Sequence, residues 1–210
     1  MRVVTSGVGN RASRTGTRAP ARVDEARRAV IDAATRLFTA KGVDAVSLRD
    51  VAAESGVHTE LIRRYVGHRH DLVRVVFEDV SRRLVEAIAA HPLEGQGFDA
   101  DSVMGQWVRI AAGLAISGRQ LPVDAEHNPV TAMAATLVEG YGVDSRSAQL
   151  RAAQIVATAL GWRVFEDYLV EAGGLSDVPL QHLREELVHS GRRLGATPWP
   201  SPPDPPPRRG

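Results

Sequence analysis

The sequence predicts an all-α protein, and three observations support this class. Alanine, the strongest helix former, is abundant, whereas aromatic residues make up only 5% of the chain. Apolar residues recur at spacings of three and four, which is the period of a helix, and no segment alternates as a strand does. With 43% hydrophobic residues in a chain of 210, there is enough apolar surface for a real core.

The first predicted helix covers residues 24–40. Asp24 and Glu25 favour a helix N-terminus, and Lys41 followed by Gly42 is typical of a helix C-terminus. One apolar stripe lies between these ends, formed by Val30, Ala33, Ala34, Leu37 and Phe38. We expect this stripe to face the core.

Two short helices are predicted next, at 48–55 and 59–66. Ser47 precedes the first of them and Asp50 lies three positions later, which is the spacing of a capping box. Gly56 interrupts the helical pattern between the two segments. Together with the helix before them, these segments form a group of three.

A long helix over 70–90, ended by Pro92, is expected to connect the two halves of the chain. Clusters of Gly, Pro, Asn and Asp separate the later helical segments, which are predicted at 99–118, 129–140, 145–172 and 179–195.

Residues 48–67 have the features that a helix-turn-helix requires. Ala52 is small enough to let a second helix cross closely, and Gly56, four positions later, suits the tight turn. The apolar side chains available to fill the space between the two helices are Val51, Val57, Ile62 and Tyr65. An ordinary antiparallel helical corner is the alternative, but the whole pattern after a first helix favours the helix-turn-helix.

Charge is unevenly distributed, although the net charge is only +1. Residues 1–23 carry five arginines and no acidic residue, whereas residues 24–90 are balanced. Such a basic arm is typical of a disordered segment that contacts nucleic acid, and a solvated tail is the alternative. The last residues contain seven prolines, which predicts an open tail. The predicted organisation is an arm at 1–23, a helix-turn-helix at 24–70, a helical part at 71–196 and a disordered tail at 197–210.

The segment AVIDAATRLFTAKGVDAVSLRDVAAESGV, residues 29–57, closely resembles the N-terminal signature of the TetR family of one-component regulators. The resemblance implies a helix-turn-helix DNA-binding head joined by a long helix to an all-helical ligand-binding and dimerisation domain. It also implies the function: a homodimeric repressor that a small-molecule effector releases from a palindromic DNA operator. Two recognition helices would change their spacing when the effector binds.

The recognition helix departs from the usual pattern of this family, so its operator must be considered from its own residues. Arg63 or Arg64 suits guanine, Thr59 a thymine methyl group, and Glu60 a cytosine amino group. Phosphates are the expected partners of Tyr65, Arg69 and Arg49. The complete predicted DNA-binding set is Ser47, Arg49, His58, Thr59, Glu60, Arg63, Arg64, Tyr65 and Arg69.

Two further sites are predicted in the second half. Met104, Trp107 and Leu114 share a helix and are candidates to line a mainly apolar effector cavity, although such a stripe is more often plain core. The segment 145–172 combines small residues, which allow close approach of another helix, with aromatic residues, which provide area, and this composition suits burial between helices. The resemblance places this helix and 179–195 in a four-helix dimer bundle, with Ala153, Ala157 and Trp162 at the interface; an intramolecular core is the alternative.

Other function classes have less support. The chain has no cysteine, and we predict no catalytic site, metal site or cofactor. The alternatives are a small all-α enzyme that uses His127, His182 or His189, and a dimeric scaffold whose helix-turn-helix no longer binds DNA. The longest uncharged apolar stretch, 152–162, is too short to span a membrane. Because the first residues also lack a signal-like apolar run, we expect a cytoplasmic protein.

Overall fold

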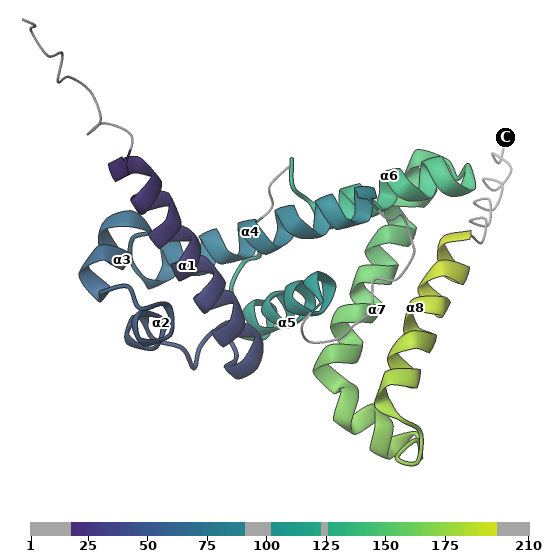
Figure 1. Cartoon of the computed structure of the whole chain (residues 1–210). Coiled ribbons are helices and arrows are strands. Elements are labelled where there is room, and N and C mark those ends of the chain that lie inside the picture. The colour runs from purple at the N-terminus through teal and green to yellow at the C-terminus, as the bar shows by residue number, and fades with distance from the viewer. Residues whose placement is uncertain (1–17, 91–101, 123–125, 197–210) are drawn as a thin grey trace, which may run out of the picture.

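A computed structural model describes residues 18–90, 102–122 and 126–196, and these residues form helices joined by short connections (Figure 1). The helices are α1 (Arg18–Lys41), α2 (Leu48–Ser55), α3 (Thr59–Tyr65), α4 (Arg69–Ala90), α5 (Val103–Ile116), α6 (Pro129–Tyr141), α7 (Ser145–Ala172) and α8 (Leu180–Ala196). No strand occurs within these described ranges, and the predicted all-α class is confirmed. The tail at 197–210 and residues 1–17 of the predicted arm lie outside them.

The helices follow one another along an elongated molecule (Figure 1). At one end, α1 packs against α2 and α3, and the N-terminal part of α4 begins beside them. From there α4 runs to α6, packing on the way against α1 and α5. At the other end α7 and α8 pack against each other as an antiparallel pair. The long helix α4 therefore connects the two ends, as the sequence predicts.

The first helix begins earlier than predicted. It starts at Arg18 instead of Asp24, so the last residues assigned to the basic arm, Arg22 among them, belong to a helix. Proline at position 20 falls in the first turn, where its missing N–H group is tolerated and its fixed φ is favourable. The apolar stripe begins only further along the helix, so the apolar spacing did not indicate this first turn, and Pro20 was the one sequence feature that could have done so.

The helix-turn-helix forms as predicted. The Asp50 N–H donates to the Ser47 hydroxyl oxygen at 3.3 Å, and the Ser47 N–H donates to Asp50 Oδ2 at 2.8 Å, which completes the capping box. Gly56 ends α2 with a φ of 69°, a left-handed conformation that glycine adopts at little cost. Val51 and Ile62 are fully buried, and Val57 packs against the same core.

One hydrophobic core extends along most of the molecule. It includes buried side chains from α1 through α5, and Ala159 of α7 belongs to it as well. A second, smaller cluster joins α6 and α7 through Ala134, Leu137, Ala148 and Ala152. The boundary predicted at residue 70 falls at the start of α4, and the main core is continuous across it. The helix-turn-helix and the helices α4 and α5 therefore share one core.

Candidate nucleic-acid interface and internal cavity

Helix α3 presents a polar face outward. Ile62 is fully buried and fixes the rotation of the helix, so the side chains around it are directed to solvent. Of the predicted DNA-binding residues, Ser47, Arg49, His58, Glu60, Arg63 and Arg64 are exposed, whereas Thr59 and Tyr65 are half-buried. The structure thus brings the predicted base-contacting residues together on one short helix.

Two of these residues are paired with each other. Arg63 donates from one terminal nitrogen to Glu60 Oε1 at 2.9 Å, one turn earlier on α3, and both side chains are largely exposed. An exposed pair of this kind is weak and can exchange for another partner. Arg63 must therefore leave Glu60 to bind a guanine, whereas the structure records no such pair for Arg64 within the described residues.

Arg69 has a different position from the one predicted. Its guanidinium donates to the main-chain oxygens of Val43, at 2.6 Å, and Val46, at 3.1 Å, and lies 3.7 Å from Asp44. The side chain is only 32% exposed. The prediction that Arg69 holds a phosphate is revised, because its donors are directed into the protein, where they fasten the first turn of α4 to the segment between α1 and α2.

Asp44 connects this end of the molecule to the end of α5. Its carboxylate accepts hydrogen bonds from Ser117 and, at 2.8 Å, from a terminal nitrogen of Arg119. The hydrogen bond from Ser117 and the nearby charges of Arg119 and Arg69 hold the pKa of Asp44 below its ordinary value. Asp44 is therefore an anion that links the helix-turn-helix region to the segment following α5.

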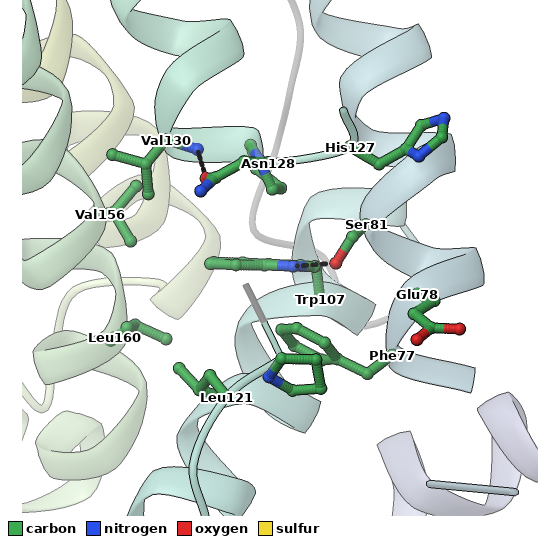
Figure 2. Close-up of a pocket in the computed structure, with 12 residues that line it drawn as sticks. Phe77, Glu78, Ser81, Trp107, Leu121, His127, Asn128, Val130, Val156 and Leu160 are labelled. Carbon is green, nitrogen blue, oxygen red and sulfur yellow. Dashed lines mark hydrogen bonds between the residues drawn. The ribbon is translucent and has the colours of Figure 1, made fainter. Parts of the chain in front are cut away.

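A cavity of about 150 Å³ lies between α4, α5, α6 and α7 (Figure 2). Trp107 of α5 lies across its centre, and its indole N–H donates to the Ser81 hydroxyl oxygen on α4 at 3.0 Å. The ring of Phe77 is 6.0 Å from that of Trp107, centroid to centroid. Val156 and Leu160 of α7 form the opposite wall.

Of the three residues predicted to line an effector cavity, one lines this cavity. Trp107 lines it, but Leu114 is 2% exposed within the main core and Met104 packs against that core. The residues that sequence reasoning missed come from other elements: Phe77, Ser81, Leu121, Val130, Val156 and Leu160. Because helical spacing places residues on one face of one helix, it could not show which faces of four helices meet.

Helix α7 carries an exposed apolar face. Ala153 and Ala157 are exposed, and Val164, Phe165 and Tyr168 extend the same side of the helix. Phe165 is 56% exposed and Tyr168 68%, which is unusual for aromatic side chains. Phe165 and Tyr168 are among the aromatic residues that the sequence predicts to be buried between helices. Val164 was not predicted, although its helical spacing from Ala157 would have found it.

Trp162 is not on this face. It lies nine positions after Ala153, about half a turn away around the helix. Its indole N–H donates to Glu166 Oε2 at 2.9 Å, and Arg184 of α8 binds both oxygens of the same carboxylate at 2.8 and 3.0 Å. Within one chain, Trp162 thus supports the carboxylate through which α7 pairs with Arg184 of α8, so its place at a dimer interface stays a prediction.

Glu166 is buried at this junction, with a side chain 7% exposed. Burial raises the pKa of a carboxyl group, but here the hydrogen bonds from Arg184 and Trp162 and the charges of Arg184 and Arg163 outweigh it. The pKa of Glu166 is therefore below its ordinary value.

The histidines of the enzyme alternative are dispersed. His127 lines the cavity, whereas His182 and His189 are exposed on α8. Across the described ranges, no three metal-ligating side chains come together. Nor is any helix in those ranges long and apolar enough to cross a membrane.

Comparisons with known proteins agree with this geometry. Residues 30–75 match the family model described as bacterial regulatory proteins, tetR family. The HTH-type transcriptional repressor Rv3405c of Mycobacterium tuberculosis is 26% identical over 81% of this chain and 89% of its own length. The HTH-type transcriptional regulator Mb3439c of Mycobacterium bovis matches to the same extent.

Two solved structures share the fold. A tetR-family transcriptional regulator from Streptomyces coelicolor aligns with a TM-score of 0.57 at 19% identity, covering 81% of this chain and 80% of that one. A transcriptional regulator from Rhodococcus sp. Rha1 aligns with a TM-score of 0.55 at 17% identity, covering 80% and 95%. The helix-turn-helix region of this chain therefore matches the family model of TetR-type bacterial regulatory proteins, and most of the chain is similar to transcriptional regulators.

Proposed function

We propose that this protein is a transcriptional repressor that binds a DNA operator as a homodimer and is released by a small-molecule effector. The observation that carries the proposal is α3, a short helix whose rotation is fixed by buried Ile62 and whose outer face holds two adjacent exposed arginines. A helix of this kind after a tight turn fits the major groove. The similarity to a protein named as a repressor in Mycobacterium tuberculosis supports repression rather than activation.

The contacts that we propose follow from side-chain chemistry. Arg63 and Arg64 chelate guanine O6 and N7, and Thr59 meets a thymine methyl group. Tyr65 and Arg49 contact phosphates, which fix the register without specifying sequence. Ser47 and His58 lie at the starts of α2 and α3, where exposed groups can approach the backbone.

Dimerisation through α7 and α8 is supported by the exposed apolar face of α7. A face that includes Ala157, Phe165 and Tyr168 exposes small and aromatic side chains at helical spacing, which suits close packing against a second copy. Two-fold symmetry of the protein then requires a near-palindromic operator, with half-site centres roughly 34 to 36 Å apart or a multiple of that.

The effector site that we propose is the cavity around Trp107. It is bordered by α4, the helix that begins beside the helix-turn-helix, so a ligand that prefers one tilt of α4 shifts the spacing of the two recognition helices. We propose a cytoplasmic regulator without catalytic activity, because the family consists of regulators and no observation favours the enzyme alternative.

The test is a selection of duplexes from a random DNA library by the purified full-length protein. The proposal expects one near-palindromic site. Arg63→Ala and Arg64→Ala should each weaken binding to it by about 1 to 3 kcal/mol, and at least one should relax base preference at a defined position. Enrichment of no sequence, or equal losses on every duplex for both variants, would refute base recognition by α3.

A further inference from the structure

We infer that the cavity around Trp107 takes an uncharged, single-ring molecule that carries one hydrogen-bond acceptor, such as an aryl ketone. The inference rests on the proposed function, because it takes the cavity to be the effector site and names the chemistry of the effector. Size, wall chemistry, charge and one buried hydroxyl group each restrict the ligand.

The size of the cavity restricts the ligand to about one ring. Its volume is about 150 Å³, and an apolar cavity of this size holds benzene. Sites for drug-sized molecules are larger, from about 300 Å³ upward. Long acyl chains and fused polycyclic compounds are therefore too large for the cavity as it stands.

The walls favour a flat, apolar molecule. Because the N–H of Trp107 is already bound to Ser81, the indole offers the cavity only its π surface. Val130 lies on one side of this ring, and Leu121 and Leu160 lie on the other (Figure 2). An aromatic ring can stack on or meet the edge of the indole while the aliphatic side chains close around it.

Charge excludes ionised ligands. No lysine or arginine is among the described residues that line the cavity. Glu78 and His127 lie at its rim with their side chains directed away from the Trp107 ring (Figure 2), and Glu78 is bound by Arg74 at 2.8 and 3.1 Å. A carboxylate or ammonium group in the cavity would lose its hydration without gaining a partner of opposite charge.

Ser81 supplies a polar contact at the cavity centre, and the amide of Asn128, whose Oδ1 accepts from the Val130 N–H at 2.9 Å, also lines the cavity. It is 4% exposed, and its hydroxyl oxygen points toward the cavity centre, where it accepts from Trp107 (Figure 2). A hydroxyl group also carries a proton to donate. Within the described residues, the structure records no acceptor for this proton. A carbonyl oxygen on the ligand would accept this proton, so Ser81 is a residue that determines specificity.

The test is isothermal titration calorimetry of the full-length protein with four single-ring probes. Acetophenone is uncharged and has an acceptor, ethylbenzene lacks the acceptor, benzoate is an anion and benzylamine is a cation. We expect acetophenone to bind most tightly, with benzoate and benzylamine at least about tenfold weaker. Ser81→Ala should remove most of the advantage of acetophenone over ethylbenzene, which we expect to be about fivefold.

A second pair of variants keeps the test valid if Ser81→Ala disturbs Trp107. Val156→Phe fills the cavity from α7 and should abolish acetophenone binding, whereas Ala135→Phe, at an exposed position of α6 outside the cavity, should leave it unchanged. Benzoate binding as tightly as acetophenone, or acetophenone binding that survives Val156→Phe, would overturn the inference.

Failure of this inference can be told apart from failure of the proposed function. Duplex selection needs no ligand, so a protein that selects an operator but binds none of the four rings disproves the ligand class alone. If acetophenone binds through the cavity and no duplex is selected, the ligand chemistry stands and the proposed regulator function fails.

Discussion

At the scale of single residues, α3 carries an ion pair whose partners must separate when the protein binds DNA. Glu60 holds Arg63 at 2.9 Å in the structure, and both must separate if Arg63 is to bind a guanine. A carboxylate next to a DNA backbone is repelled by phosphates unless it finds a cytosine amino group. We therefore expect Glu60 to act mainly by weakening binding to wrong DNA sequences.

Glu60→Gln should tighten binding to non-specific duplexes, because it removes the repulsion between the carboxylate and the phosphates and frees Arg63. The difference in affinity between the specific duplex and non-specific duplexes should therefore become smaller. Competition binding on the selected duplex and on a scrambled duplex measures both effects. Glu54→Gln is the matched control, since Glu54 is also exposed and paired with an arginine, Arg36, at 3.2 Å, but lies on α2. If Glu60→Gln discriminates as well as the unaltered protein, Glu60 has no part in selecting the operator.

At the scale of helices, Arg69 fastens the start of α4 to the segment that connects α1 and α2. The sequence suggested a phosphate contact there because arginine at the end of a helix-turn-helix suits one. What the sequence could not show is that the carbonyl oxygens of Val43 and Val46 converge on the same point from a different part of the chain.

Arg69→Ala should lower the free energy of unfolding by about 1 to 3 kcal/mol, because two main-chain acceptors lose their partner. Arg49→Ala, a change on the exposed surface of α2, should leave it almost unaltered. Chemical denaturation followed by circular dichroism compares the two. If the Arg69→Ala protein keeps full stability but binds every duplex more weakly by the same factor, the original prediction that Arg69 contacts a phosphate is right.

The pairing of α7 with α8 should depend on pH through Glu166. Its pKa is lower in the folded protein than its ordinary value near 4.5, so ionised Glu166 stabilises the fold above that value. The stabilisation is lost as the pH falls through the lowered folded pKa, because the carboxyl group then takes up a proton and loses its attraction to Arg184.

Glu166→Gln should therefore reduce stability by about 2 kcal/mol near neutral pH, and the difference from the unaltered protein should shrink as the pH falls below about 4.5. Glu171→Gln, an exposed change on the same helix, should show no such trend. Thermal melts between pH 3 and pH 7, a range chosen to include these titrations, measure the effect. A constant difference at all pH values would show that Glu166 contributes by packing alone.

For the whole molecule, the fold could be predicted from the sequence more fully than its sites. Helical spacing and capping residues are local, so α2 and α7 agree with the predicted ranges and the all-α class is confirmed. The cavity depends on four helices meeting, and only Trp107 was found for it. The hydrogen bond of Trp162 to Glu166 could not be predicted either, because a tryptophan suits any contact between helices.

The proposed dimer makes a further prediction. Ala153→Arg and Ala157→Arg put a charge on the exposed face of α7 and should yield monomers that lose operator binding. Ala135→Arg, at an exposed position on α6, should leave the dimer intact. Sedimentation velocity distinguishes the species. Persistence of the dimer in both α7 variants would move the interface to another surface.

The central claim is that the exposed face of α3 binds one DNA sequence in preference to others. The most direct measurement is the affinity of the full-length protein for the selected duplex and for a duplex of the same composition in scrambled order, by fluorescence anisotropy at one fixed salt concentration. The account predicts that the selected duplex binds at least about a thousandfold more tightly, which is typical of specific binding. Equal affinity for the two duplexes would contradict it.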